Sequence, residues 1–274
     1  MRDKLIVQRT GTRLSTVAAL ALGALVITGC ATMPSDPEAR AAYLEASDPL
    51  EPLNRAIFSF NLGLDKALLR PLAAAYNTVL PDPVRDGVRN FLNNLRTPIV
   101  LANDVLQGEI GRAGETVGRF LLNSTIGVGG LFDIATELGF EFHDEDFGQT
   151  LAVWGVGEGP YLMLPILGPS NPRDAVGLVG EYFADPVVIW TNNTDREWIL
   201  YTRTGVNTVD RRSRNVKTLE ELERTSLDFY AAVRSLYRQR RMDEIRNGES
   251  GDPVGIPSIT FDLDENLDTL SSLD

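Results

Sequence analysis

The sequence predicts an all-α protein built from many short helices, with at most one small β-hairpin. Between residues 48 and 245, apolar residues recur at spacings of three and four, which is the period of an amphipathic helix. Prolines recur at the ends of these segments, where they suit a first helical turn and break a helix interior. Apolar residues make up 43% of the 274-residue chain, enough for a folded core.

The first residues of the chain predict a secretory signal. A basic start is followed by an uncharged run over residues 14–27, which is too short for a permanent membrane span of about 20 residues. The run ends in Ile27-Thr28-Gly29-Cys30, which resembles the bacterial lipobox, where the cysteine is acylated and becomes the new N-terminus. We expect residues 1–29 to be a lipoprotein signal peptide and Cys30 to carry the lipid anchor. The alternative is an ordinary signal peptide with an incidental cysteine.

Two further segments flank the helical body. Residues 30–47 are small and polar and predict a lipidated tether. Ala and Thr follow Cys30, and by resemblance to lipoprotein sorting in Gram-negative bacteria the lack of Asp there favours the outer membrane. Residues 242–274 hold nine acids and one arginine, so we expect an acidic, disordered tail over residues 246–274.

The expected elements follow in chain order. Residues 54–69 are apolar almost all round, which suits a buried or lipid-contacting helix. One apolar stripe predicts a short helix over 84–95, and a separate helical piece follows over 98–106. Two short extended pieces are expected around the glycine-rich turn 155–159. The remaining expected helices cover residues 109–125, 131–138, 174–183, 185–192 and, as one long helix, 218–246.

Charge and composition exclude several classes of function. The formal net charge of −12 argues against general nucleic-acid binding. One cysteine and one histidine cannot form a disulfide or a His/Cys zinc cage. His143 lies in the acidic run 141–146, which could attract a cation, but its spacing is not that of an EF-hand, and a solvated loop is the favoured reading. We therefore expect no catalytic residue, no metal and no cofactor.

A basic cluster with neighbouring aromatic residues lies between residues 190 and 217. Its cations include Arg203, Arg211 and Arg212, with Trp190 and Trp198 close by in the sequence. Aromatic rings beside Arg and Lys are typical of a membrane interface, where the cations contact lipid phosphates. The alternative is a solvated basic face with buried tryptophans.

A series of motifs in a fixed order resembles the VacJ/MlaA family of outer-membrane lipoproteins. The resemblance covers residues 48–190 and includes the lipobox. The motifs are DPLEPLNR (48–55), FSFN (58–61), RP (70–71), NF (90–91), NL (94–95), Pro98, LQG (106–108), RFLLNST (119–125), GVGGLFD (127–133), DFGQTL (146–151) and WGVGEGPY (154–161).

This resemblance implies a fold and a function. It implies a compact ring- or disc-shaped helical domain over residues 48–245, with a central pore, lying on the periplasmic side of the outer membrane of a Gram-negative bacterium. Such proteins remove phospholipids that have strayed into the outer leaflet and pass them to a soluble periplasmic lipid carrier, which is MlaC-like. A trimeric porin is the implied membrane partner. No covalent chemistry is implied.

The candidate site residues follow from the same resemblance. Phe58, Phe60 and Asn61 are expected to hold the resting state of the pore, with core packing as the alternative. Gly127, Gly129 and Gly130 form a gate hinge or only a tight turn. Arg203, Arg211 and Arg212 are expected to face lipid headgroups. The candidates for porin contact are Phe142, Asp146, Phe147 and Trp154. Two other functions stay open, which are a structural or interaction lipoprotein and a periplasmic hydrolase.

Overall fold

The computed structural model describes residues 48–247. The predicted signal peptide, Cys30, the tether and the tail from residue 248 onward lie outside the described residues. The elements are α3 (Glu51–Leu64), the π-helical turn η1 (Asp65–Leu69), α4 (Arg70–Val79), α5 (Asp82–Gln107), α6 (Ile110–Thr125), α7 (Ile134–Glu137), α8 (Phe147–Val153), β1 (Leu162–Leu164), β2 (Gly168–Ser170), α9 (Pro172–Ala184), α10 (Pro186–Asn193), α11 (Glu197–Arg214), α12 (Val216–Thr225) and α13 (Phe229–Ile245).

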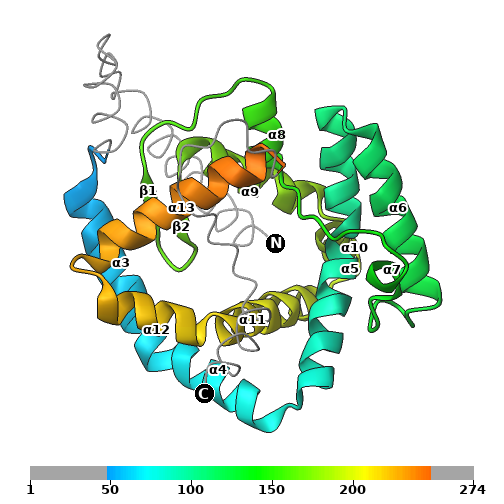
Figure 1. Cartoon of the computed structure of the whole chain (residues 1–274), viewed down its shortest axis with the longest axis horizontal. Helices are drawn as coiled ribbons and strands as arrows, with labels where there is room; N and C mark the ends of the chain where they lie inside the picture. Colours follow the sequence, from blue (N-terminus) through cyan, green and yellow to red (C-terminus); the bar gives the residue numbers. More distant parts are fainter. Residues whose placement is uncertain (1–47, 248–274) are drawn as a thin grey trace, which may run out of the picture.

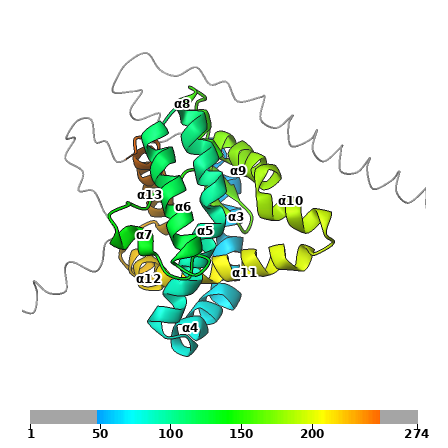
Figure 2. The ribbon, with the colours of Figure 1, turned by 90° about the vertical axis from the view of Figure 1, so that its right-hand side faces the viewer.

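The helices are arranged around a ring (Figure 1). The helices α3 and α4 form one side, the long α5 with its neighbour α6 forms the opposite side, and α11 and α13 run between the two. Seen from the side, α5 and α6 run next to each other with α7 at one end (Figure 2). The expected all-α, ring-shaped fold with one small hairpin is therefore confirmed.

The ring is closed by contacts between the two ends of the described chain. Buried Asp48, which precedes α3, accepts hydrogen bonds from the Tyr230 hydroxyl and from Asn54 Nδ2 at 2.7 Å. Arg234 Nη1 lies 3.2 Å from the same carboxylate. Arg55 Nη2 pairs with Asp228 at 2.5 Å. These contacts tie α3 to α13, which lie at opposite ends of the sequence.

The helix α5 is longer than the sequence predicted. Residues 82–107 form one helix of 26 residues with Pro98 inside it, so the expected break at Pro98 is wrong. Proline lacks the N–H that would continue the helical ladder, but the Thr97 hydroxyl donates to the carbonyl of Asn93 at 3.2 Å next to it. Packing along α6 holds both halves in line. The helix ends at Gly108, whose φ is +84°.

The expected long last helix is instead two helices, α12 and α13. The backbone leaves the helical conformation and becomes extended at Ser226, and the side chain of Leu227 is fully exposed. Asp228 then begins α13 as its N-cap, because its carboxylate accepts the Ala231 N–H at 3.2 Å. A cap of this kind starts a new helix where apolar spacing alone suggests a continuous one.

The predicted hairpin exists, but its position was wrong. The strand β1 pairs antiparallel with β2 through Leu162↔Ser170, Met163↔Pro169 and Leu164↔Gly168, so the turn falls at 165–167 rather than at 155–159. Gly155 and Gly159 have positive φ and turn the chain. The pairing begins only beyond Pro160, in the apolar run, where side chains can pack against α3.

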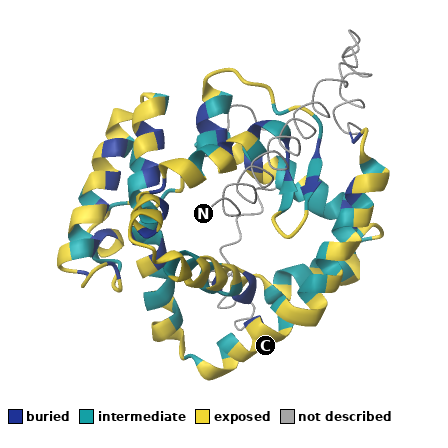
Figure 3. Cartoon of the chain, turned by 180° about the vertical axis from the view of Figure 1, so that it is seen from behind, coloured by how far each residue is buried: buried dark blue, intermediate teal, exposed yellow. Residues whose placement is uncertain are grey.

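Burial in the described chain is unusual. Apart from glycines, its buried residues comprise 20 polar or charged and 10 apolar ones, whereas 36 large apolar side chains are exposed. Figure 3 shows exposed residues along nearly every helix. The apolar cluster is small, with Tyr161, Met163 and Tyr230 at its centre. Exposed apolar surface of this extent indicates a membrane or a protein partner. Within residues 48–247, no helix has both the length and the apolar character that crossing a bilayer requires.

Candidate functional site

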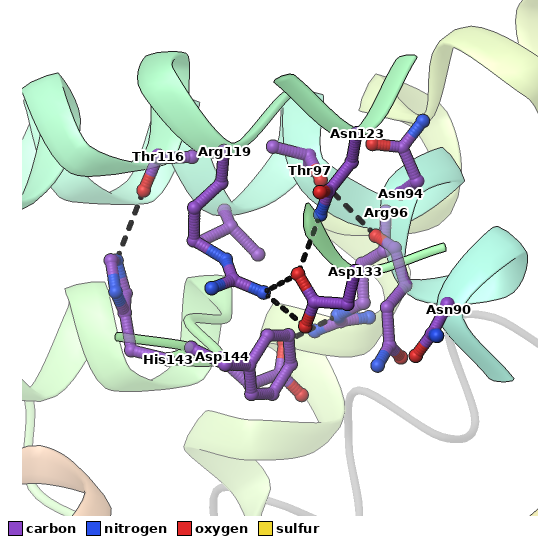
Figure 4. Close-up of a pocket in the computed structure, with 13 residues that line it drawn as sticks. Asn90, Asn94, Arg96, Thr97, Thr116, Arg119, Asn123, Asp133, His143 and Asp144 are labelled. Carbon is purple, nitrogen blue, oxygen red and sulfur yellow. Dashed lines mark hydrogen bonds and ion pairs between the residues drawn. The ribbon is translucent and has the colours of Figure 1, made fainter. Parts of the chain in front are cut away.

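A polar pocket lies between α5 and α6 and is bordered by residues 142–144 (Figure 4). Both helices turn amide, hydroxyl and guanidinium groups toward it, and four of its lining residues are asparagines. The lining residues are Asn90, Asn93, Asn94, Arg96, Thr97, Val100, Thr116, Arg119, Asn123, Asp133, Phe142, His143 and Asp144. A pocket of this kind can hold a small polar group by hydrogen bonds.

Arg119 anchors one wall of the pocket. Its guanidinium donates to both carboxylate oxygens of Asp133, at 2.9 and 2.8 Å (Figure 4). It also donates to the Phe140 carbonyl. Asn123 Nδ2 donates to the same carboxylate at 2.9 Å, and Asn123 Oδ1 accepts the Ala135 N–H. Burial opposes ionisation of Asp133, but the hydrogen bonds from Thr136, Asn123 and Arg119 outweigh it and lower its pKa. The wall is therefore ionised and rigid.

The acidic run 141–146 is a loop, as expected, but it is only partly solvated, because Glu141 and Asp144 are exposed whereas Glu145 is buried. Glu145 is 1% exposed, accepts a hydrogen bond from Gln107 at 2.8 Å and pairs with Arg112 at 2.8 Å. Its burial raises its pKa. Cations from the neighbouring helices replace the water that the sequence led us to expect. In the described residues, no group of three or more His, Cys, Asp or Glu side chains could hold a metal ion.

His143 lies against a buried carboxylate on α5. Its Nε2 is 3.2 Å from Asp104 and 3.0 Å from the Thr116 hydroxyl (Figure 4). The Thr116 hydroxyl donates to Asp104 at 2.6 Å, so its proton is directed to the carboxylate and not to the imidazole. This arrangement does not activate Thr116 as a nucleophile, since that would need the histidine to accept the proton. It holds segment 142–144 to the α5–α6 pair.

The predicted glycine hinge forms a tight turn beside the pocket. Val128, Gly129 and Gly130 all have positive φ, of 53°, 72° and 91°. A Cβ on Gly130 would lie 2.4 Å from the Asn94 side chain, and one on Gly127 would lie 2.3 Å from the Phe132 carbonyl. The turn therefore needs glycine for conformation and for space. Its role as a gate hinge stays a prediction.

Asn61, a predicted gating residue, holds the hairpin from α3. Its Nδ2 donates to the Leu164 carbonyl at 2.9 Å, and its Oδ1 accepts the Ile166 N–H at 2.8 Å. Asn54, two turns earlier, makes the same pair of bonds to the Tyr161 carbonyl at 3.0 Å and the Met163 N–H at 2.9 Å. Each side-chain amide thus donates to one backbone carbonyl and accepts from one backbone N–H of the hairpin segment, as the backbone of an adjacent strand would. Together they fix the position of β1 on α3.

The two predicted gating phenylalanines lie in different surroundings. The half-buried Phe58 makes edge contacts with the rings of Phe229 and Tyr230, at 5.4 and 5.5 Å between centroids, and so helps to close the ring. Phe60 is 57% exposed. Their role in the resting state of a pore stays a prediction.

The predicted headgroup-facing arginines are also separated. Arg203 on α11 pairs with Asp185 at 2.6 Å and lines a second pocket, between α5, α9, α10 and α11. Arg212 is buried, and both its Nε and Nη2 contact Asp65, at 2.6 and 2.9 Å. Arg211 is exposed and lines neither pocket. Of the three, only Arg203 combines a cation with a recess that a ligand can enter.

Three of the four predicted porin-contact residues belong to α8 or its ends, whereas Phe142 lies beside Arg119 on α6, whose guanidinium carbon is 5.4 Å from the Phe142 ring centroid. Phe142 and Trp154 are each 53% exposed, and Trp154 makes an edge contact with Phe147 at 6.0 Å. Asp146 begins α8 as its N-cap and contacts Arg241 at 2.5 Å. Phe142 and Trp154 therefore present apolar surface at two places, and Asp146 fixes α8.

Some residues of the site were not recognised from the sequence. Arg96 borders both pockets and contacts Asp144 at 2.7 Å and Glu181 at 3.3 Å. Asn94 belongs to the family motif at 94–95, but its position in a pocket was not expected. The available signal was the group Asn90, Asn93, Asn94 in the middle of an amphipathic helix, where asparagine is a weak helix former.

The fold and the pockets define a class of protein, an all-helical ring that buries polar groups and exposes apolar ones. The family model for the MlaA lipoprotein matches residues 46–244. The chain belongs to the MlaA lipoprotein family.

Relatives and a solved structure agree with this assignment. The chain is 36% identical over 260 residues to the intermembrane phospholipid transport system lipoprotein MlaA of Escherichia coli, covering 92% of this chain and 97% of that protein. It is 36% identical to an uncharacterised protein of Rickettsia prowazekii over 208 residues, which are 76% of this chain and 81% of that one. A structure solved in work on the structural basis for maintenance of bacterial outer membrane lipid asymmetry matches with a TM-score of 0.65 and 34% identity, covering 73% of this chain and 99% of that one.

Proposed function

We propose that this protein is an outer-membrane lipoprotein that removes phospholipids from the outer leaflet and passes them through a polar-lined opening in the ring to a soluble periplasmic carrier. The observation that carries the proposal is the pattern of burial, in which polar side chains are twice as numerous as apolar ones inside and large apolar side chains lie outside. Family membership and the similarity to the intermembrane phospholipid transport system lipoprotein of Escherichia coli support it.

The physical reason lies in the cost of moving a headgroup. A charged group that enters an apolar medium without partners loses several kcal/mol of solvation. Helices that expose apolar side chains to lipid can supply polar partners on their other faces, as α5 does with its asparagines and Arg96. The headgroup then meets hydrogen-bonding groups while its acyl chains stay in apolar surroundings, and no bond has to be broken.

The proposed anchor and partners complete this function. Acyl chains on Cys30 hold the ring at the periplasmic face of the outer membrane, because more than one chain gives firm anchoring. A trimeric porin contacts the surface near Phe142 and Trp154, which are both exposed. The carrier takes up the lipid on the periplasmic side.

Deletion of the gene tests the proposal. We expect phospholipid to accumulate in the outer leaflet, measured by surface labelling of amine headgroups on intact cells, and to return to its original level when the gene is supplied again. Unchanged surface labelling would overturn the transport function and favour a structural lipoprotein. Turnover of phospholipid by the purified protein, abolished by neutralising one carboxylate, would instead establish a hydrolase.

A further inference from the structure

The second pocket is lined by residues of α5, α9, α10 and α11. It encloses about 650 Å³, including the part that is open to solvent. None of the residue roles predicted from the sequence, apart from that of Arg203, refers to it. Because the recess opens to solvent, a polar group can enter it from outside.

The charged part of this pocket is two ion pairs, and Arg96 also contacts Asp144, which does not line this pocket, at 2.7 Å. Arg203 Nη1 lies 2.6 Å from Asp185 Oδ2, and Arg96 Nη1 lies 3.3 Å from Glu181 Oε2. All four side chains are at most 25% exposed. The two arginines come from α5 and α11, whereas the two acids come from α9 and the start of α10. The lining thus presents two cations and two anions and is formally neutral.

The rest of the lining combines the apolar side chains of Ile99, Leu178, Val188 and Leu200 with the hydroxyl and amide groups of Tyr182, Thr204 and Asn207. Ile99 and Val188 are buried in the pocket wall, and Leu178 is 50% exposed at its opening. Beside it, α9 and α10 expose Val179, Phe183 and Trp190. Hydrocarbon entering the pocket would therefore remain in contact with apolar side chains.

We propose that this pocket binds one zwitterionic phospholipid, with its phosphate on Arg203 and Arg96, its ammonium group on Asp185 and Glu181, and its chain along Ile99 and Leu178. Guanidinium groups bind phosphate with two parallel hydrogen bonds, and carboxylates accept from an ammonium group. A neutral lining disfavours an anionic headgroup, because that headgroup would bring an uncompensated charge into a half-buried site. This inference rests on the proposed function, since it names the lipid class and the residues that would receive it.

Asp185→Asn gives a sharp test because it changes charge and little else. Asp185 is the N-cap of α10 and accepts the Val187 N–H at 2.8 Å, and asparagine is an equally good N-cap. The variant leaves the pocket with one cation in excess. The purified protein is incubated with detergent micelles that contain equal amounts of phosphatidylethanolamine and phosphatidylglycerol, and the retained lipids are quantified by mass spectrometry.

The wild-type protein is expected to retain mainly phosphatidylethanolamine. In Asp185→Asn the ratio of phosphatidylethanolamine to phosphatidylglycerol falls about tenfold, the effect of one charge-assisted hydrogen bond. Arg203→Gln lowers total retention about tenfold, and Arg203→Lys, which keeps the charge without the planar fork, lowers it less. The matched control Arg240→Gln, at a side chain 80% exposed on α13, leaves amount and ratio unchanged.

Three results would overturn the inference. If wild-type protein retains phosphatidylglycerol preferentially, the pocket does not select zwitterions. If Asp185→Asn and Arg203→Gln both retain lipid as the wild type does, the lipid binds elsewhere, and only this inference fails. If the folded wild-type protein retains no phospholipid and the gene deletion leaves surface labelling unchanged, the proposed function fails with it.

Discussion

The side-chain oxygen of Asn61 accepts a hydrogen bond of 2.8 Å from the backbone N–H of Ile166, a residue held at a φ of +68°. A β-branched residue in this region is strained, by roughly 1–2 kcal/mol. The same amide donates to the carbonyl of Leu164, the last residue of β1 before the turn. One side chain on α3 therefore maintains an unfavourable backbone conformation at an exposed apolar hairpin tip.

Asn61→Ala is expected to loosen this hairpin. Loss of both hydrogen bonds should lower the free energy of unfolding by about 1–3 kcal/mol and speed hydrogen exchange at the Ile166 amide. Thermal unfolding and exchange mass spectrometry in detergent measure the two effects. Ser59→Ala, an exposed position on the same helix, is the control and should change neither. Equal exchange in the wild type and Asn61→Ala would show that Asn61 does not hold the tip.

Ile166→Asn is expected to stabilise the protein by about 1 kcal/mol, because asparagine tolerates positive φ better than isoleucine does. Urea unfolding of the detergent-solubilised protein gives the difference. Leu167→Asn changes the neighbouring exposed residue, which has no positive φ, and should give no such gain. Similar effects from the two substitutions would mean that strain at Ile166 is not what matters.

Two glycine substitutions in the turn beside the pocket should differ in their cost. Gly129→Ala meets no atom within 4 Å and carries only the penalty of its φ of +72°, about 1 kcal/mol. Gly127→Ala would place a Cβ 2.3 Å from a backbone oxygen and forces the turn to move. We expect a lower melting temperature for Gly127→Ala than for Gly129→Ala. The reverse order would contradict the packing described for this turn.

Acid should weaken the contacts of Arg241, which lies between Asp146 at 2.5 Å and Asp174 at 2.8 Å. Burial opposes ionisation of both acids, but Arg241 outweighs it and lowers both pKa values below the usual 3.8. Their contribution to stability is therefore present above about pH 4 and is lost as the pH falls through the lowered pKa values. Arg241→Met should cost about 3 kcal/mol near pH 7 and much less near pH 2, measured by urea unfolding.

The matched control for this pH dependence is Arg240→Met, at the adjacent exposed residue. It should leave the loss of stability in acid as it is in the wild type. An Arg241→Met variant that loses stability in acid as steeply as the wild type would show that other carboxylates control the transition.

Cys30→Ala should release the protein from the outer membrane, because the acyl chains would have no attachment site. Separation of the membranes by density, followed by immunoblotting, measures this. Full retention of the variant in the outer membrane would mean that the exposed apolar side chains of the ring hold it there without the acyl chains.

The sequence predicted where helices occur better than where one helix ends and the next begins. Apolar spacing placed α6, α9 and α10 within two residues of their ends. It failed at Pro98, where packing against α6 overrides a local helix breaker, and at Asp228, where a cap divides one apolar stripe into two helices. Both errors come from interactions, helix packing and helix capping, that the spacing of apolar residues does not reveal.

The candidate site was predicted only where a residue belonged to a motif or a basic cluster. Asn61 and Arg203 were found in this way, and both make the long-range contacts described above. The roles of Arg96 and Arg119 were missed because their partners lie on other elements, at Glu181 and Asp133. Nothing in the local sequence pairs them, since the pairing follows from how α5 and α6 meet their neighbours.

The joining of α3 to α13 also has a consequence for how the chain folds after the proposed export. The bonds from Asp48 to Tyr230 and from Arg55 to Asp228 span more than 170 residues. Contacts of such sequence separation form slowly, because a long loop must close before they contribute. An exported chain emerges with its N-terminal part first. The helix α3 therefore lacks its partner α13, and its apolar side chains stay exposed, until nearly the whole domain has emerged. This interval is when the chain is most exposed to aggregation and to proteases, and a binding protein that shields α3 would protect it most.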